Sequence, residues 1–354
     1  MKKAIIAMSG GVDSSVAAYL CVKGGYECIG ATMKLFDNED IGKKQEKTCC
    51  SLEDVEDARS VASKLGMPYY VFNFTDEFDE KVIKKFIHAY ETGATPNPCI
   101  DCNRYLKFEK LFVRMKEIGY DFVVTGHYAR IEKDGNRFLL KKGIDDSKDQ
   151  SYVLYSMTQE QLAHTLFPLG EYTKTHIREI AEENGFINAK KHDSQDICFV
   201  PDGDYAAFIE QYAGKEYPDG DFVDKKGNRL GTHRGIIRYT VGQRKGLGLS
   251  LPEPMYVCSK DIEKNKVVLC RNEELFSSQL DADDFNWIAF ENPPETITAK
   301  ARIRYNQREE AAKITVTGDK NVHIEFEKPQ RAIAKGQAVV VYDGDVVLGG
   351  GTIK

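Results

Sequence analysis

Two cysteine-containing segments, far apart in the chain, have residue types that suit sulfur chemistry. The first, Thr95–Asn103, reads Thr-Pro-Asn-Pro-Cys-Ile-Asp-Cys-Asn, and the second, Asp193–Phe199, carries Cys198. The prolines favour an extended first segment, which we expect to end just before a helix that begins near Tyr105. A helix N-terminus with basic side chains beside it lowers the pKa of a thiol. The sequence therefore predicts that Cys102 is a nucleophilic thiolate.

The nine cysteines of the chain leave other interpretations open. Cysteine is often buried and inert, and we assign that role to Cys21, Cys28, Cys258 and Cys270. Cys99 and Cys102 have the spacing of half a zinc site, but no second pair of ligands at zinc spacing follows. Together with Cys198 they make three thiols that could hold a [4Fe–4S] cluster, although we favour direct thiol chemistry. Cys49 and Cys50 remain unassigned.

A loop rich in glycine and serine, at the end of the first predicted strand, has the composition of a phosphate site. Ser9–Ser15 reads Ser-Gly-Gly-Val-Asp-Ser-Ser. Glycines permit a tight turn close to a ligand, and the N–H groups at a helix N-terminus attract anions. The loop has neither the Gly-x4-Gly-Lys pattern nor the Gly-x-Gly-x-x-Gly pattern, so it is neither the usual P-loop nor a dinucleotide fingerprint. Within it, Asp13 could hold Mg²⁺ on a phosphate or cap the helix.

The elements around these residues alternate between strand and helix over the first 125 residues. Apolar runs predict strands at Lys3–Met8, Tyr26–Met33, Tyr69–Phe74 and Phe122–Thr125. Helical spacing predicts helices at Asp13–Lys23, Leu52–Leu65, Phe78–Tyr90 and Tyr105–Ile118. Such alternation predicts an α/β domain with a parallel sheet, in which the turn after the first strand is a favoured ligand site.

The second half of the chain has a different character, because turn-forming residues separate short apolar runs after Asp202. Closely spaced strands are predicted at Thr296–Tyr305, Ala311–Thr317, Val322–Glu327, Ala338–Tyr342 and Val346–Ile353. We therefore expect three domains: residues 1–203, a small central domain at 204–280 and a C-terminal β-barrel at 281–354.

Charge and composition exclude some classes of protein. The net charge of −6, from 49 basic and 55 acidic side chains, excludes a global positive field for nucleic acid. Basic residues gather locally in Thr232–Ser250, which has no acid, and in Ala301–Arg308. Both stretches suit contact with RNA, and a solvated charged face is the alternative. The apolar runs are too short to span a membrane and the N-terminus lacks a secretory apolar region, so we expect a cytosolic protein.

Several motifs, taken in chain order, resemble one enzyme family. Ser9–Ser15 resembles the PP-loop of the N-type ATP pyrophosphatases, which cleave ATP to AMP and pyrophosphate and activate a carbonyl oxygen as an adenylate. Further motifs are Pro96–Asn103, Thr125–Tyr128, Lys148–Tyr152, Asp193–Phe199, Gly242–Gly248 and Leu348–Gly351. Together they resemble the bacterial tRNA-specific 2-thiouridylase family over nearly the whole chain. The resemblance implies a Rossmann-like parallel sheet of the PP-loop type, then a small central domain and a β-barrel.

The resemblance also implies a reaction. Members of the family convert the wobble uridine in the anticodon stem-loop of certain tRNAs into 2-thiouridine. ATP with Mg²⁺ activates the C2 oxygen as an adenylate, a persulfide donor or sulfur-relay protein supplies sulfur, and AMP and pyrophosphate are released. Separately from the resemblance, the sequence shows no long amphipathic helix of an obligate coiled-coil dimer, so we expect a monomer when the protein is free of tRNA.

The implied residue roles fall into four groups. Cys198 resembles the cysteine that bears the persulfide, and Cys102 resembles the nucleophile that completes transfer, with a disulfide formed between them. The positions that match the ATP site are Ala7, Met8, Ser9, Gly10, Gly11, Val12, Asp13, Ser14, Met33 and Gly126. The positions that match the target-base site are Asn97, Pro98 and Cys99. Those that match tRNA contacts are Lys148, Asp149, Gln150, Arg304 and Tyr305, to which the basic stretch adds Arg244 and Lys245.

One position departs from the family pattern. The best-known members have an aspartate where this chain has Cys99, and the nearest acid here is Asp101. This leaves the general base open and adds a third thiol to the cluster interpretation. Two other functions remain: a PP-loop ligase that forms an adenylate without thiol chemistry, and a non-catalytic tRNA-binding sulfur carrier. His127 is either a nucleotide or base contact or a buried structural histidine.

Overall fold

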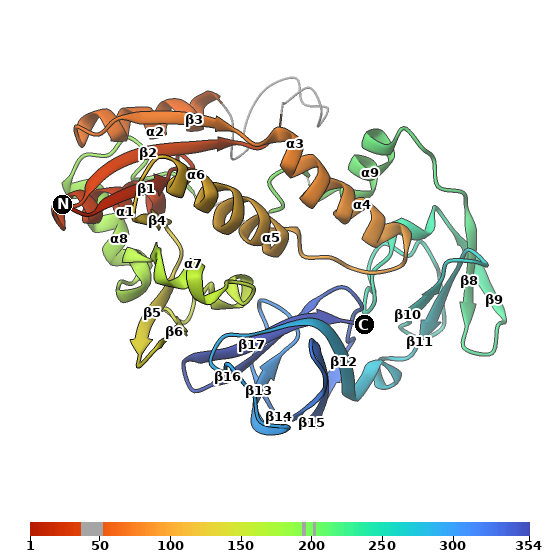
Figure 1. Ribbon diagram of the computed structural model, residues 1–354. Helices are drawn as coiled ribbons and strands as arrows, with labels where there is room; N and C mark the ends of the chain where they lie inside the picture. The colour runs from red at the N-terminus through yellow and green to blue at the C-terminus, as the bar shows by residue number, and fades with distance from the viewer. Residues whose placement is uncertain (37–51, 193–195, 201–202) are drawn as a thin grey trace.

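The computed structural model of the chain describes residues 1–36, 52–192, 196–200 and 203–354. An N-terminal region, a smaller central region and a C-terminal region follow one another along the chain, coloured from red through green to blue in Figure 1. Within the described ranges, no helix combines the length and the apolar character that crossing a bilayer requires. Cys49 and Cys50, which the sequence analysis left unassigned, lie outside these ranges.

A five-stranded parallel sheet forms the centre of the N-terminal region, in the order β3-β2-β1-β4-β7. Its strands are β1 (Lys3–Ala7), β2 (Glu27–Lys34), β3 (Tyr69–Asn73), β4 (Phe122–Val124) and β7 (Thr165–Leu166). The chain moves outward from β1 to β3 and then returns to the other side of β1 with β4, so the strand order reverses between β1 and β4. Open parallel sheets bind ligands at the carboxyl ends of strands at such a reversal. The predicted α/β fold is confirmed.

Helices cover both faces of this sheet. Successive residues of β1 point to opposite sides, so each face of the sheet contributes apolar side chains to its own core. Ile5 and Ala7 join a core with α3, α4 and α6, while Ala4 and Ile6 join a second core with α1, α2 and α8. The helices are α1 (Val12–Lys23), α2 (Leu52–Lys64), α3 (Thr75–Phe78), the π-helical η1 (Asp79–Ile83), α4 (Lys84–Glu91), α5 (Pro98–Asp101), the π-helical η2 (Cys102–Lys110), α6 (Leu111–Glu117), α7 (Gln159–Ala163) and α8 (Lys174–Glu183). Short 3-10 turns are η3 (Ser151–Leu154) and η4 (Pro168–Glu171).

The helix that carries Cys102 begins earlier than predicted. The sequence analysis placed its start near Tyr105, but α5, η2 and α6 follow one another without a break from Pro98 to residue 117. Pro98 stands at the first helical position, where its missing N–H costs nothing. The Asn97 side chain caps the helix by accepting a hydrogen bond at 3.2 Å from the backbone N–H two residues on. The prolines therefore open a helix, and Cys102 lies beyond its first turn.

The central region consists of helix α9 (Tyr205–Ala213) and a four-stranded sheet in the order β10-β11-β8-β9. Its strands are β8 (Gly220–Asp224), β9 (Arg229–His233), β10 (Tyr256–Asp261) and β11 (Lys266–Cys270), with the 3-10 turns η6 (Ile236–Arg238) and η7 (Asn272–Leu275). Phe222 of β8 and Phe208 of α9 belong to the same apolar core as Phe86 of α4. The central region is therefore packed directly on the N-terminal region.

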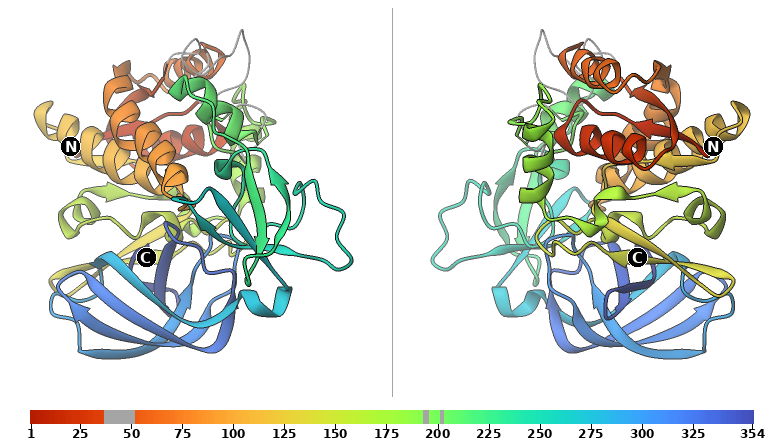
Figure 2. Two further views of the ribbon diagram at one scale, coloured as in Figure 1. Left: turned by 90° about the vertical axis from the view of Figure 1, so that its right-hand side faces the viewer. Right: turned by 90° about the vertical axis from the view of Figure 1, so that its left-hand side faces the viewer.

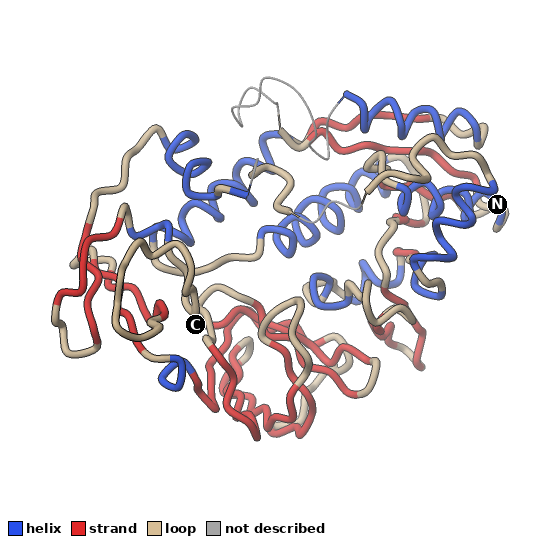
Figure 3. Tube along the Cα trace, turned by 180° about the vertical axis from the view of Figure 1, so that it is seen from behind, coloured by secondary structure: helices blue, strands red, loops and turns tan. Residues whose placement is uncertain are grey.

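The C-terminal region is a closed six-stranded antiparallel barrel. Its strands lie in the order β12-β15-β14-β13-β16-β17, and a β12–β17 pairing closes the ring. They are β12 (Phe276–Trp287), β13 (Thr296–Arg302), β14 (Glu310–Gly318), β15 (Asn321–Arg331), β16 (Ala338–Asp343) and β17 (Val346–Ile353). Figure 3 shows the contrast between this strand-rich region and the helix-rich N-terminal region. The barrel is confirmed, although β12 begins ahead of residue 281; the exact domain boundaries stay a prediction.

A hairpin of the N-terminal region extends the barrel sheet. Strands β5 (Ala129–Asp134) and β6 (Arg137–Lys142) pair with each other, and β6 also pairs with β17. The Arg137 guanidinium donates to the Ile288 carbonyl oxygen at 2.8 Å, which adds a side-chain link. In both views of Figure 2 the yellow hairpin lies against the blue barrel. The sequence analysis did not predict this hairpin, which fixes the barrel against the N-terminal region.

Candidate active site

The Ser9–Ser15 loop lies at the carboxyl end of β1 and leads into α1. Gly10 has a φ of +73°, and a Cβ added there would lie 2.4 Å from a backbone carbonyl oxygen of α2, so the position requires glycine. The hydroxyls of Ser14 and Ser15 donate to the Gly11 carbonyl oxygen at 3.0 and 3.1 Å. These contacts hold the loop in one conformation at the edge of the sheet.

Helix α1 offers its N-terminus as an anion site. Its N-cap residue is Gly11, and no side chain in the described part of the protein caps it. The first N–H groups of a helix lack partners inside the helix, and the positive end of the helix dipole lies beside them. A phosphate group placed here would satisfy both, as the sequence predicts for this turn.

Two further residues predicted for ATP binding lie at the same edge of the sheet. Met33 is near the carboxyl end of β2, and Gly126 follows β4. A Cβ on Gly126 would lie 2.8 Å from the backbone carbonyl carbon of Asp13 and 2.9 Å from the backbone nitrogen of Ser14. The turn after β4 therefore touches the first turn of α1. The topology brings the predicted ATP-site residues to the carboxyl ends of three neighbouring strands.

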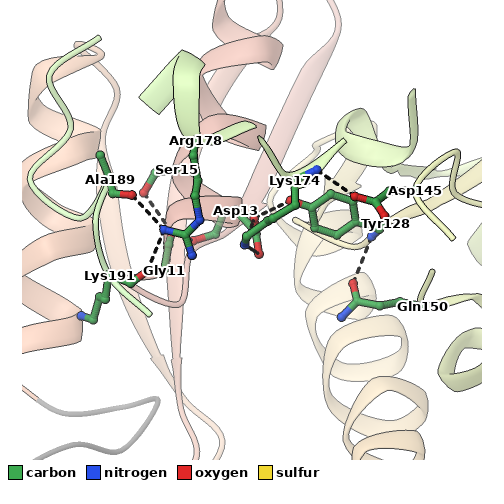
Figure 4. A network of polar contacts seen from close by, with 11 residues as sticks. Gly11, Asp13, Ser15, Tyr128, Asp145, Gln150, Lys174, Arg178, Ala189 and Lys191 are labelled. Carbon is green, nitrogen blue, oxygen red and sulfur yellow. Dashed lines mark hydrogen bonds and ion pairs between the residues drawn. The ribbon is translucent and has the colours of Figure 1, made fainter. Parts of the chain in front are cut away.

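Asp13, in the first turn of α1, is held by two side chains from other elements (Figure 4). The Lys174 ammonium of α8 donates to Oδ1 and Oδ2 at 2.7 and 2.8 Å, and the Tyr128 hydroxyl donates to Oδ1 at 2.7 Å. Gly11 is the N-cap residue, so the prediction that Asp13 caps the helix is wrong. The sequence analysis missed Lys174, because no local pattern links residues 161 positions apart.

Both cysteine segments pack against one layer of the N-terminal region. Cys102 and Cys198 are half-buried and lie against the same apolar core. Phe199, next to Cys198, is buried with its ring centre 5.6 Å from that of Phe78 and 5.2 Å from that of Phe86. These two rings belong to α3 and α4, and the helices α5 and η2 contact α3 and η1. Both cysteine segments therefore pack on the same continuous helix, α3-η1-α4.

Charged side chains surround the residues next to Cys102. Asp101 accepts a hydrogen bond from Lys85 Nζ at 2.5 Å, and Arg104 forms an ion pair with Asp284 of β12. Burial raises the pKa of Asp101, against the opposing charge of Lys85. Burial acts to raise the pKa of Asp284, but the hydrogen bond and charge of Arg104, together with nearby lysines, outweigh it and the pKa is lowered. Of these two carboxyl groups, Asp101 is the one that binds a proton more readily than usual.

The segment predicted to meet the target base lies where the N-terminal region meets the barrel. Just before it, the Thr95 N–H donates to the Lys335 carbonyl oxygen at 2.8 Å, and Gln337 Nε2 donates to the Thr95 carbonyl oxygen at 2.7 Å. Tyr305, which follows β13, has a pKa raised first by burial, then by the charge of Asp149 and, to a smaller extent, by Cys99. Cys99 itself is exposed. Tyr305 of the barrel is therefore an electrostatic neighbour of the target-base segment.

Several residues that match tRNA contacts have their side chains engaged within the protein. Asp149 is buried, accepts from the Ser151 hydroxyl at 2.9 Å and pairs with Arg302 of β13 at 3.0 Å. Gln150 Oε1 accepts from the Tyr128 N–H at 3.0 Å. The Arg304 guanidinium donates to the carbonyl oxygen of Ala332 at 2.6 Å. These side chains build the loop and its junction with the barrel, and the sequence analysis had no signal for the Arg302–Asp149 pair.

The loop at residues 240–248 presents Arg244 and Lys245 to solvent, where both are exposed. Gln243 fixes the loop from inside: its Oε1 accepts from the Thr240 N–H at 3.0 Å, and its Nε2 donates to the Lys245 carbonyl oxygen at 3.0 Å. Two adjacent cations are therefore displayed on a backbone of defined shape, as a phosphate contact requires.

His127 is buried in an aromatic environment. Its Nδ1 lies 2.7 Å from Thr125 Oγ1, and its ring lies beside those of Phe108 and Phe167. Burial holds the pKa of His127 well below its ordinary value, so the imidazole is neutral at pH 7. Of the two interpretations of this residue, the buried structural histidine fits these contacts.

The thiols do not form a metal centre in this structure. Across residues 1–36, 52–192, 196–200 and 203–354, no three His, Cys, Asp or Glu side chains are grouped so that they could hold a metal ion. Cys99, Cys102 and Cys198 all lie in these ranges, so they do not fit the [4Fe–4S] ligand set that the sequence left open. The Asp13 carboxylate, for which Mg²⁺ binding was one of two alternatives, accepts hydrogen bonds from Lys174 and Tyr128.

Three family profiles match successive parts of the chain. The tRNA methyl transferase HUP domain matches residues 2–202, the tRNA methyl transferase PRC-barrel domain matches residues 206–271, and the aminomethyltransferase beta-barrel domain matches residues 277–353. The matches follow the order of the three regions of the structure.

Relatives match over the full length of the chain. The chain is 52% identical to the tRNA-specific 2-thiouridylase MnmA of Clostridioides difficile, covering 100% of this chain and 98% of the relative. It is 51% identical to that of Clostridium acetobutylicum, covering 100% and 99%. Among solved structures, a 4-thiouridine synthetase–RNA complex with bound ATP has a TM-score of 0.37 at 20% identity, over 60% of this chain and 50% of that one. A structural likeness of that size supports no argument about the site.

Proposed function

The chain belongs to the tRNA-specific 2-thiouridylase family, and from this premise we propose how its residues carry out the reaction. Full-length identity of 52% to a named member makes the protein an ATP-dependent tRNA-modifying enzyme. The proposed substrate is the wobble uridine in the anticodon stem-loop, and the proposed site of action is the cytoplasm, where tRNA is modified.

The first proposed step is adenylation of the uridine. The C2 oxygen attacks the α-phosphorus of ATP, and pyrophosphate leaves. Hydroxide is a poor leaving group whereas AMP is a good one, so C2 becomes open to a sulfur nucleophile. A closed pocket around an extruded base keeps water from competing for the activated carbon.

The second proposed step transfers sulfur between two cysteines. A persulfide donor loads Cys198, and the terminal sulfur of this persulfide attacks C2 while AMP departs with the original oxygen. The Cys102 thiolate then attacks Sγ of Cys198, which breaks the bond to the transferred sulfur, leaves C2 as a thiocarbonyl and forms a Cys102–Cys198 disulfide. A thiol reductant supplies the two electrons and two protons that restore both cysteines.

One observation carries this proposal: Cys102 and Cys198, 96 positions apart in the sequence, both pack against the apolar core that covers one face of the parallel sheet. Met33, which matches an ATP-site position, packs against that same core. This shared packing supports a single site for the nucleotide, the base and both thiols.

The proposed ATP site comprises the strand-end residues already described. The α1 N–H groups and the loop backbone from Ala7 to Ser14 would bind the phosphates, and Gly126 would let the nucleotide approach the first turn of α1. Mg²⁺ would arrive on ATP, shielding charge on the phosphates. No cluster enters the proposal, because the three thiols do not fit one.

The proposed base site comprises Asn97, Pro98 and Cys99, with Tyr305 of the barrel beside them. Asn97 is committed to capping α5. Cys99 replaces the aspartate of the best-known members, and Asp101, whose pKa is raised by burial, is our candidate for proton transfer here. Lys148, Arg304, Arg244 and Lys245 are the proposed cationic contacts to tRNA.

Replacing Arg244 and Lys245 together by alanine should weaken tRNA binding about tenfold and flatten the salt dependence of log Kd by roughly 1.5. The reason is that each exposed cation releases counterions when it meets a phosphate. Filter binding across a series of salt concentrations measures both quantities. Alanine at Lys225 and Lys226, on the β8–β9 turn of the same region, is the matched control. A slope equal to that of the wild type would remove these residues from the tRNA surface.

The proposed function is tested by incubating the protein with unmodified tRNA, ATP-Mg²⁺, a persulfide donor and a thiol reductant. We expect 2-thiouridine at the wobble position, measured by nucleoside mass spectrometry of anticodon fragments, with AMP formed in equal amount. AMP formed on tRNA without thiouridine, even with an excess of the persulfide donor, would point to an adenylating ligase. Sulfur loaded on the protein without any ATP cleavage would point to a non-catalytic carrier.

A further inference from the structure

The ion pair between Asp13 and Lys174 joins the ATP loop to an element the sequence did not connect with it. The Lys174 side chain is 10% exposed and the Asp13 side chain is 32% exposed, so the ammonium is largely shielded from solvent and the carboxylate is shielded in part. Both carboxylate oxygens accept from the ammonium. Removing one partner of such a pair leaves an uncompensated charge in a poorly solvated place.

Lys174 occupies a position that is unfavourable for a cation. It is the first residue of α8, beside the positive end of that helix dipole, where acidic side chains are preferred. The Thr173 side chain caps this helix, and the Lys174 N–H donates to Asp145 Oδ2 at 3.0 Å, which holds the backbone in place. Helix α8 packs on α1 through Ile177 and Ala181, which share a core with α1 residues. A cation fixed at this point needs a counter-charge, and Asp13 supplies it.

Tyr128 determines the orientation of the Asp13 carboxylate. Its hydroxyl donates to the same Oδ1 that Lys174 binds, and its ring lies under the ammonium, with Nζ 5.8 Å from the ring centre. Gln150 holds Tyr128 from both sides, because it accepts from the Tyr128 N–H and donates its own N–H to the Tyr128 carbonyl oxygen at 2.9 Å. The Asp13 carboxylate therefore points toward Lys174 at the start of α8 (Figure 4).

We propose that Lys174 and Tyr128 are positioning residues of the ATP site: Lys174 neutralises Asp13, Tyr128 orients it, and Asp13 binds this lysine in place of Mg²⁺. The inference rests on the proposed function, in which ATP phosphates lie at the N-terminus of α1. ATP is strongly anionic, so a bare carboxylate in the first turn of α1 would repel it. With Lys174 in place, the loop carries no net charge and the helix N-terminus attracts the phosphates.

The test is a double-mutant cycle of Lys174→Met and Asp13→Asn, with ATP affinity measured on the protein alone by calorimetry. Lys174→Met should weaken ATP binding about 10- to 50-fold, and KM for ATP should rise while kcat changes less than about threefold. The double variant should recover to within about fivefold of the wild type, because no uncompensated charge remains. Tyr128→Phe should show a smaller loss in the same direction.

Three results would overturn the inference. Lys174→Met with unchanged ATP affinity would remove its role. A double variant as weak as Lys174→Met would mean that the lysine contacts ATP itself. A large rise in the Mg²⁺ concentration that Asp13→Asn needs for AMP formation would make Asp13 a Mg²⁺ ligand. If circular dichroism shows that Lys174→Met is unfolded, the ATP affinity of the double variant and the Mg²⁺ requirement of Asp13→Asn decide the inference instead.

Lys215→Met is the control, since Lys215 also pairs with a carboxylate, Glu91 at 2.9 Å, but lies away from the ATP loop. It should bind ATP as the wild type does. The readout also separates the two proposals. A wild-type protein that binds ATP yet makes no 2-thiouridine would defeat the proposed function, while the pattern of ATP affinities among the variants would still decide the role of Lys174.

Discussion

Replacing either Cys102 or Cys198 by serine is expected to reduce 2-thiouridine formation by on the order of a thousandfold or more, because each thiol makes a covalent bond that serine cannot replace. The two variants should fail at different steps. Cys198→Ser should not accept a persulfide, whereas Cys102→Ser should accept it and then stall before the thiocarbonyl is released. Sulfane sulfur on the protein, measured by mass spectrometry before and after addition of tRNA and ATP-Mg²⁺, separates these outcomes.

AMP formation gives an internal comparison for the same variants. Adenylation is proposed to use the strand-end loops, which neither thiol builds, so AMP formation in the first turnover should fall less than about tenfold. Cys258→Ser is the matched control, because Cys258 is also half-buried but lies in the central region. Normal thiouridine yields from Cys102→Ser and Cys198→Ser would instead favour direct attack on C2 by sulfur that is not bound to the protein. If Cys99→Ser were the only variant to lose activity, Cys99 would be the nucleophile.

Local sequence signals predicted the parts of this molecule that neighbouring residues determine. The Ser9–Ser15 loop was placed at the first strand–helix turn, where the glycines and the helix N-terminus are consecutive in sequence. The parallel sheet and the barrel followed from the spacing of apolar runs. The start of the Cys102 helix was missed, because Pro98 fits both an extended segment and the first position of a helix. Only the Asn97 cap, seen in the structure, decides between them.

Long-range contacts account for most of what sequence reasoning missed. Nothing near Lys174 signals that it reaches Asp13, and nothing near Asp149 signals that it is buried against Arg302 of the barrel. The pairing of β6 with β17 is equally non-local. These contacts form a continuous route: Asp149 and Gln150 are neighbours in one loop, Gln150 holds Tyr128, and Tyr128 holds Asp13. The loop that matches a tRNA contact is thereby joined to the ATP loop and to the barrel.

Gly126→Ala is expected to reduce ATP-dependent activity by about a hundredfold or more, although the change adds a single methyl group. The methyl carbon would lie 2.8 Å from the carbonyl carbon of Asp13 and 2.9 Å from the nitrogen of Ser14. Both contacts are with backbone, which cannot rotate away as a side chain can. The first turn of α1 or the turn after β4 must therefore move, and both belong to the proposed ATP site. KM for ATP and the rate of tRNA-dependent AMP formation measure the effect.

The matched control for this change is Gly318→Ala, in the barrel. There the nearest atom to an added Cβ is the Asn321 side-chain nitrogen at 3.3 Å, which is free to turn aside, so activity and stability should stay close to those of the wild type. Gly126→Ala should also lower the free energy of unfolding, by about 1–3 kcal/mol, the usual cost of overpacking. A fold that keeps its stability and its ATP affinity would mean that the two turns are not in contact. Lost stability with unchanged ATP affinity would instead place the nucleotide away from the β1–β4 reversal, and the proposed site would have to move.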